Sequence, residues 1–241
     1  MATFRRLAPY GVPDLVAQIG MWVAFALAYE AIRGAVDQDR TRAFANGRRI
    51  IEIERRLHGF FELAAQRAVP GRAVDDLFRA TYWISEFVLL VLALVYTYFR
   101  RHDVYRRFRN AVLITNSLAL VGYLVFPTAP PRLFAAYGFR NDLSGQPTPA
   151  HAAGLIAFAA NPYAAMPSLH VADALLIGVF LATLSRSRVW KAAWALWPCW
   201  VAYVVIASGN HFWLDAAAGA TLAGFALLVV AVLERRRAWR L

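Results

Sequence analysis

The sequence has one cysteine, Cys199, among 241 residues, which excludes an intrachain disulfide. It lies between Pro198 and Trp200 in an apolar stretch, so we expect it to be buried as a small hydrophobic residue. No small-residue cleavage site follows the first apolar run, so a cleavable signal peptide is not predicted. Acidic residues are also scarce, with 15 Asp and Glu against 26 Lys and Arg.

Apolar residues, by contrast, are abundant. They make up 60% of the chain and the mean hydropathy is +0.44, which is too apolar for a soluble domain. A helix needs about 20 apolar residues to cross a bilayer. We therefore predict an all-α, polytopic membrane protein in which residues 1–241 form a single domain with six transmembrane helices. These are Asp14–Arg33, Tyr82–Phe99, Arg109–Phe126, Ser168–Ser185, Val189–Ser208 and Leu214–Leu233.

The net charge of +11 is confined to alternate connections. The two termini and the connections between predicted helices 2 and 3 and helices 4 and 5 hold 14 bases and three acids, whereas the rest of the chain has 12 of each. This is the positive-inside pattern, so both termini are predicted to be cytoplasmic in a multi-pass protein of the plasma (inner) membrane. Nucleic-acid binding is not needed to explain the charge.

Two long connections are predicted on the outer side. The first, about residues 35–81, has apolar residues at helical spacing between charged ones, which predicts an amphipathic helix in the membrane interface or across the bundle. We interpret it as a structural collar, with a role in substrate gating as the alternative. Its apolar residues are Ile50, Ile53, Leu57, Phe60 and Ala64.

The second outer connection, about residues 127–167, is longer than a turn requires, and loops of that length are often lids or binding loops. It begins with PTAPPRLF, whose prolines are expected to present Arg132 on a stiff, extended segment at the membrane surface. A guanidinium group suits bidentate binding of phosphate. Arg132 is therefore a candidate phosphate-binding residue.

A turn and a helix start end this connection, in NPYAAMPSLHVAD from Asn161 to Asp173. Pro167 suits the first turn of a helix because its φ is helical and its missing N–H would be unpaired there. Ser168 and His170 are thus expected at a helix N-terminus. Its unpaired N–H groups and partial positive charge favour an anion such as phosphate.

A second polar segment, GNHFWLD, lies between the fifth and sixth predicted helices, on the same side of the membrane. Gly209 permits an unusual turn, and Asn210 is a plausible helix cap. His211 and Asp215 are four residues apart, which places them on one face if the helix has already begun. The two segments are therefore expected to converge at the outer face.

Two histidines, a carboxylate, an arginine and a helix N-terminus at one face indicate phosphoryl transfer. His211 is the candidate nucleophile, and Asp215 would hold its other ring nitrogen and stabilise positive charge. His170 would donate a proton to the departing alkoxide. Arg132, the Ser168 hydroxyl and backbone N–H groups would bind the phosphate oxygens. No metal or other cofactor is required.

Two alternatives stay open for this site. A metal cluster of His170, His211, Asp215 and Asp173 is disfavoured because Arg132 and the helix dipole would repel a cation. The histidines could also merely satisfy hydrogen bonds within a bundle. Asp173, one helical turn after His170, is expected either to accept a hydrogen bond from His170 and favour its protonated form or to make a polar contact between helices.

Three motifs resemble those of the type 2 phosphatidic acid phosphatase superfamily: PTAPPR at Pro127–Arg132, MPSLH at Met166–His170 and GNHFWLD at Gly209–Asp215. The nearest branch is similar to the bacterial relatives of fungal inositol phosphorylceramide synthase. The resemblance implies a six-helix membrane core and the metal-free histidine mechanism given above.

The chain departs from the common motifs in three places. Leu169 stands where most members have Gly, as tends to be so in the synthase-like branch. Val204 and Val205 replace a Ser-Arg pair, and Pro-Pro-Arg replaces a Lys followed by Arg-Pro. Of the family's phosphate-binding bases, Arg132 alone carries over from the resemblance.

We expect a membrane lipid phosphatase that hydrolyses a lipid phosphate monoester or diphosphate at the outer leaflet through a phosphohistidine. Transfer of a phosphoinositol-type headgroup between lipids is the alternative, because an alcohol can discharge the same intermediate. A lipid transporter or structural bundle is an alternative of another class, and it predicts that His211 is dispensable. The expected partners are a lipid phosphate and the membrane; no particular oligomeric state is predicted.

Overall fold

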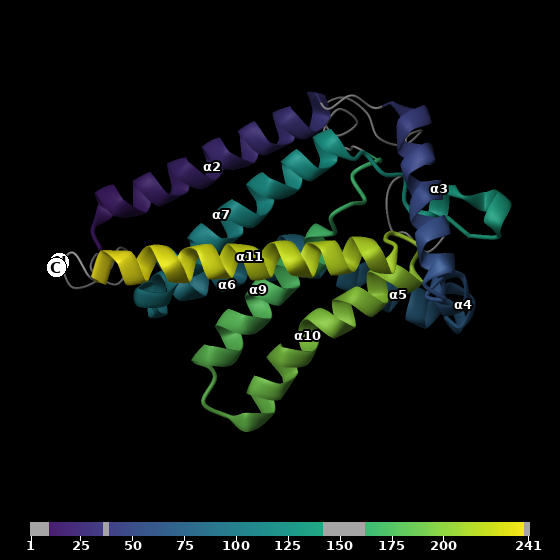
Figure 1. Ribbon diagram of the computed structural model, residues 1–241. Helices are drawn as coiled ribbons and strands as arrows, with labels where there is room; N and C mark the ends of the chain where they lie inside the picture. Colours follow the sequence, from purple (N-terminus) through teal and green to yellow (C-terminus); the bar gives the residue numbers. More distant parts are fainter. Residues whose placement is uncertain (1–9, 36–38, 142–161, 239–241) are drawn as a thin grey trace.

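The computed structural model describes residues 10–35, 39–141 and 162–238, and within them the chain is all-α apart from an isolated bridge between Thr128 and Ala164 (Figure 1). Residues 142–161 of the second outer connection lie outside the described residues. A π-helical turn, η1 (Ile84–Val88), and two 3-10 turns, η2 (Pro131–Leu133) and η3 (Ala135–Tyr137), accompany the α-helices. These are α2 (Val12–Ala35), α3 (Arg40–Arg56), α4 (Glu62–Arg67), α5 (Gly71–Trp83), α6 (Leu89–Arg100), α7 (His102–Val125), α9 (Leu169–Leu184), α10 (Arg188–Ala207) and α11 (Trp213–Ala238).

Four of these helices, α2, α7, α10 and α11, are long and apolar enough to cross a membrane. Two more, α6 and α9, are apolar but shorter, with 12 and 16 residues. All six overlap the predicted stretches, and α6 continues α5 and η1 without a break, so it ends a longer helical rod. The all-α architecture with several candidate spans is confirmed. The crossing of the membrane by all six helices stays a prediction.

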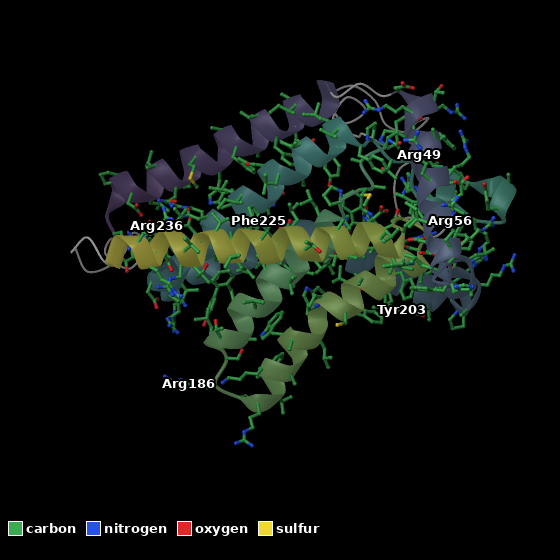
Figure 2. All side chains as sticks on the ribbon, in the orientation of Figure 1. Arg49, Arg56, Arg186, Tyr203, Phe225 and Arg236 are labelled. Atoms are coloured by element: carbon green, nitrogen blue, oxygen red, sulfur yellow. The ribbon has the colours of Figure 1, made fainter. Side chains whose placement is uncertain are left out.

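The middle of the bundle is α9. It packs against α10, α11 and α7, and its residues Ala172, Leu176 and Ile177 are fully buried. A helix that is apolar on every side suits such a position. By contrast, Phe225 of α11 is 52% exposed and Tyr203 of α10 is 45% exposed (Figure 2), as expected of side chains that face lipid. The N-terminal residues of α9 are therefore held in the interior of the protein.

The expected burial of Cys199 is wrong, because this residue is exposed on α10. Its neighbour Pro198 faces α9 instead, at Gly178, where a Cβ atom would lie 3.2 Å from the proline ring and 2.6 Å from the Trp194 carbonyl oxygen. The small residue that permits this close packing is thus on α9.

Across one end of the bundle lies α3 (Figure 1). Ile53 and Leu57, two of the apolar residues at helical spacing, are 47% and 60% exposed, so they do not belong to its buried face. The true buried stripe contains polar residues that a search for apolar spacing passes over. It consists of Ala43, Asn46, Gly47, Ile50, Ile51 and Glu54.

The polar residues of this stripe fasten α3 to the start of the second outer connection. The Asn46 side chain donates through Nδ2 to the Pro127 carbonyl oxygen at 2.8 Å. The Ala129 N–H donates to the Ala43 carbonyl oxygen at 3.1 Å. These contacts support the interpretation of α3 as a structural collar, here packed across the bundle.

The opposite end gathers the start of α2, the α6–α7 junction, the α9–α10 connection and the end of α11 (Figure 1). Arg186 and Arg236 lie toward this end, whereas Arg49 and Arg56 lie on α3 (Figure 2). The described basic connections of the positive-inside pattern thus share the end remote from α3. The side of the membrane that this end faces stays a prediction.

Candidate active site

Ser168 is the N-cap of α9, which begins at Leu169. Pro167 therefore precedes the cap, and its predicted place in the first helical turn is wrong, because the serine oxygen takes the capping role. Ser168 is fully buried, and its Oγ accepts the Val171 N–H over a long 3.5 Å. As predicted, His170 lies in the first turn of the helix, where it is 5% exposed.

The corner between α10 and α11 lies directly against Ser168. Gly209 has a φ of +73°, so the predicted unusual turn is confirmed. Further along, at Gly219, a Cβ atom would collide with the Ser168 carbonyl oxygen. The Ser168 N–H also donates to the Asp215 carbonyl oxygen at 3.0 Å. The two polar segments, far apart in the sequence, are thus joined through their backbones.

Ala165, rather than Asp215, binds the His211 ring. Nδ1 of His211 lies 2.8 Å from the Ala165 carbonyl oxygen, and since a carbonyl only accepts, Nδ1 carries the proton and Nε2 the lone pair. The Asp215 Oδ2 atom is 3.6 Å from Nδ1, too far for a hydrogen bond, and accepts the Phe212 N–H at 2.9 Å. The Asp215 carboxylate therefore lies beside the His211 ring, and the bond to Ala165 sets the orientation of this ring.

The two histidine rings lie close together in the interior. The ring centroids of His170 and His211 are 5.7 Å apart, and each residue is 5% exposed. On His170 lies the ring of Tyr82, at a centroid distance of 3.9 Å. The sequence did not single out Tyr82, because an aromatic residue at the edge of a predicted span is common at membrane interfaces.

Arg132 is buried in η2, with 8% of its surface exposed. Its Nη1 donates to Asn210 Oδ1 at 2.8 Å, and its backbone N–H donates to the Gly209 carbonyl oxygen at 2.9 Å. The predicted presentation of Arg132 on an extended segment at the membrane surface is wrong, because these bonds hold it against the corner that carries His211. The prediction of Asn210 as a helix cap is also wrong, since α11 begins only at Trp213 and Asn210 instead binds the arginine.

Among the residues that the structure describes, Arg132 is the sole buried Lys or Arg. Val204 and Val205, which occupy the places of the family's Ser-Arg pair, are fully buried. The described interior therefore offers a phosphate group one guanidinium.

Burial lowers the pKa of His211 well below its usual range, and the neighbouring His170 and Arg132 lower this pKa further. The His211 imidazole is therefore neutral near neutral pH, as a nucleophile must be. Burial also lowers the pKa of Arg132, but the usual value is so high that the guanidinium stays charged.

Asp173 makes the contact between helices that was one of its two predicted roles. Its Oδ1 accepts from Asn116 Nδ2 of α7 at 3.2 Å, and Asn116 also donates to the Val112 carbonyl oxygen at 3.0 Å. This contact holds α7 against α9 one turn from His170. The other predicted role, acceptance of a hydrogen bond from His170, stays a prediction.

Two glutamates beside this site were not singled out from the sequence. Glu54 and Glu62 are fully buried and bind the first turn of α11. Glu54 lies four residues after buried Ile50, and this spacing could have identified it. Within the described part of the chain, no group of three or more His, Cys, Asp or Glu side chains is arranged to hold a metal.

Comparisons with known proteins identify the family and a similar fold. A family model described as the PAP2 superfamily matches residues 48–229. Among solved structures, that of Aquifex aeolicus LpxE is similar, with a TM-score of 0.56 and 17% sequence identity over 71% of this chain and 92% of that chain. At this identity the similarity concerns the fold. A search of curated proteins found no match.

Proposed function

The chain belongs to the PAP2 superfamily, and from this premise we propose that it is a membrane lipid phosphatase that hydrolyses a lipid phosphate monoester or diphosphate through a phosphohistidine intermediate. Membership confirms the resemblance at the level of the superfamily, and the synthase-like branch stays a prediction. We also propose that all six apolar helices cross the plasma (inner) membrane, with both termini cytoplasmic and the site at the outer face. The described basic connections at the end remote from α3 support this orientation.

In the first step, Nε2 of His211 attacks phosphorus, and an N–P bond forms as the P–O bond to the lipid breaks. His170 gives its proton to the departing group, which is the lipid alkoxide for a monoester and the lipid phosphate for a diphosphate. Asp215, with Oδ2 3.6 Å from Nδ1, stabilises the positive charge of the phosphorylated ring. Arg132 and the Ser168 hydroxyl bind the non-bridging oxygens of the phosphoryl group.

In the second step, water discharges the intermediate. His170, now neutral, takes a proton from the water molecule as its oxygen attacks phosphorus. The N–P bond breaks, phosphate leaves, and His211 returns to its neutral form. The two histidines thus carry out every transfer of the phosphoryl group and of protons, and neither step uses a metal or other cofactor.

The observation that carries the proposal is the pair of buried histidine rings with centroids 5.7 Å apart. The bond from Nδ1 of His211 to Ala165 leaves Nε2 as the nucleophilic atom, and Arg132 supplies the charge that a phosphoryl group requires. A bundle that used its histidines only for packing would not need a buried guanidinium beside them.

Transfer of a phosphoinositol-type headgroup is the second candidate. It is favoured by Leu169, which resembles the synthase-like branch and is buried in the main core of the bundle. The first step is unchanged, and the hydroxyl group of an acceptor lipid replaces water in the second.

The test supplies labelled phosphatidic acid or polyprenyl diphosphate to the purified protein in detergent micelles. Labelled phosphatidylinositol is supplied in parallel, with and without ceramide. Free phosphate from the first two lipids supports hydrolysis, and a new labelled lipid supports transfer. His211→Ala must abolish either product. His58→Asn is the matched control, because His58 is exposed and its positive φ of 55° suits asparagine. If wild type forms neither product and His211→Ala changes nothing in cells, a lipid transporter or a structural bundle becomes the better explanation.

A further inference from the structure

Two fully buried glutamates, Glu54 of α3 and Glu62 of α4, lie beside the catalytic corner. A buried carboxyl group is costly unless hydrogen bonds compensate for its lost hydration. Neither residue takes part in the steps proposed above, so their burial requires another explanation.

Both glutamates bind the N-terminal turn of α11. The Trp213 N–H donates to Glu62 Oε1 at 3.0 Å, and the Leu214 N–H donates to Glu54 Oε1 at 3.1 Å. The preceding N–H, that of Phe212, donates to Asp215 Oδ2 at 2.9 Å. Three successive N–H groups at a helix start thus donate to carboxyl groups, two of which come from α3 and α4.

The environment of the second carboxyl oxygen of each glutamate indicates that the two side chains share a proton. The Oε2 atoms of Glu54 and Glu62 have no hydrogen-bond partner among the described residues. The charge of Glu62 acts on the Glu54 carboxyl group, so the two groups are neighbours in the interior. Two ionised neighbouring carboxylates would repel, whereas a proton on one of them relieves the repulsion and supplies a donor to the other.

Electrostatics place this proton on Glu54. Burial, followed by the charge of Glu62, raises the pKa of Glu54 to about 9, and the carboxyl group of Asp215 adds to the shift. The titratable groups that face Glu54 from the packed elements are thus Glu62 of α4 and Asp215 of α11. Near neutral pH the Glu54 carboxyl group therefore keeps its proton.

We propose that the buried side chains of Glu54, which holds a proton, and Glu62 form a pair that positions the first turn of α11, and through it His211 and Asp215, for phosphoryl transfer. The proposal rests on the function proposed above, because the position of His211 and Asp215 affects phosphoryl transfer only if the protein catalyses it. His211 lies two residues before Trp213, so a shift of this turn displaces its Nε2 relative to the substrate. Displacements of about 1 Å at a reacting group can cost about 100-fold in rate.

The first experiment compares Glu54→Gln with Glu54→Ala. Glutamine keeps an acceptor for Leu214 and a donor toward Glu62, so it mimics protonated glutamate and retains kcat within about threefold of wild type. Alanine removes both contacts and lowers kcat by about 10- to 100-fold with little change in KM. Glu52→Ala, on the exposed face of the same helix, is the control and leaves kcat unchanged. A folded Glu54→Ala protein with wild-type kcat, or a Glu54→Gln protein as impaired as Glu54→Ala, overturns the proposal.

The second experiment needs no catalytic activity. A carboxyl group whose pKa is raised by folding binds more protons in the folded state, so its contribution to stability is lost as pH rises toward the raised pKa. The thermal midpoint of wild type in detergent, measured from about pH 5 to about pH 9, should therefore fall relative to that of Glu54→Gln. A constant difference between the two proteins overturns the shared proton. If wild type releases no phosphate, the proposed function fails by itself, and this comparison still decides whether the pair shares a proton.

Discussion

Asn210 offers a sharp test of the site, because its side chain binds that of Arg132. Its Oδ1 accepts from the Arg132 Nη1 at 2.8 Å in the interior, and its Nδ2 donates to Ser208 Oγ at 2.9 Å. Asn210→Ala removes an acceptor from a buried charged donor, which costs about 1.5–3 kcal/mol. If the oriented guanidinium stabilises the transition state, kcat/KM falls by about 10- to 150-fold.

The assay follows phosphate release from labelled phosphatidic acid in detergent micelles for four proteins: wild type, the two single variants and the double variant with Arg132→Ala. Because Asn210 acts through Arg132, its replacement in the Arg132→Ala background should cost no more than about twofold. Asn110→Ala is the matched control. Asn110 Oδ1 accepts two bonds from Arg109, at 3.0 and 2.8 Å, in a pair of the same chemistry outside the active site, so kcat/KM should be unchanged.

Two outcomes would refute this reasoning. Asn210→Ala could retain wild-type kcat/KM, which would mean that the bond to Arg132 does not orient a group that binds the substrate. Alternatively, the losses from the two single variants could add fully in the double variant, which would mean that Asn210 acts independently of Arg132.

Three further predictions concern the histidines and the helix contact. His170→Ala should lower the rate by at least about 100-fold with a lipid phosphate but far less with p-nitrophenyl phosphate, whose leaving group needs no proton; equal losses would exclude His170 as the general acid. Because the pKa of His211 is lowered, the neutral nucleophile should persist below about pH 6.5, and the acid limb of kcat/KM should lie there. Arg132 lowers the pKa of His211, so in Arg132→Gln the acid limb of the remaining activity should move to higher pH. An acid limb at the wild-type pH would contradict this effect of Arg132 on His211. Gly219→Ala should lower the thermal midpoint because the new Cβ collides with the Ser168 carbonyl, whereas Gly224→Ala, with no atom within 4 Å of its Cβ, should not; equal midpoints would disprove the close contact.

Much of the fold follows from the apolar pattern, because lipid requires long apolar runs wherever a helix crosses it. The predicted stretch Ser168–Ser185 and the observed α9, Leu169–Leu184, differ by one residue at each end. The polar ends of the helices were missed because a search for apolar runs stops where the apolar residues stop. The helix α7 begins at His102, ahead of the predicted Arg109, because arginines fit a helix once it leaves the apolar region, and Arg109 binds Gln18 at 2.9 Å.

The collar shows where the apolar pattern fails. Ile53 and Leu57 have the right character and spacing for a buried face, yet they are exposed. Asn46 and Glu54 are buried, and each makes a hydrogen bond there, Asn46 to the Pro127 carbonyl oxygen and Glu54 to the Leu214 N–H. Those partners come from distant parts of the chain, so the spacing of apolar residues within the helix could not reveal them.

The sequence by itself determined which chemical groups gather at one end of the bundle, namely two histidines, Asp215 and Arg132. They meet there because the order and direction of the helices place their segments at the same end. Only the tertiary structure decided how these groups are held. Ala165, not Asp215, binds Nδ1 of His211, and Asn210 binds Arg132. The physical reason is that a hydrogen bond depends on distances of a few tenths of an ångström between segments that only packing brings together, whereas the residue type alone establishes what chemistry a side chain can perform.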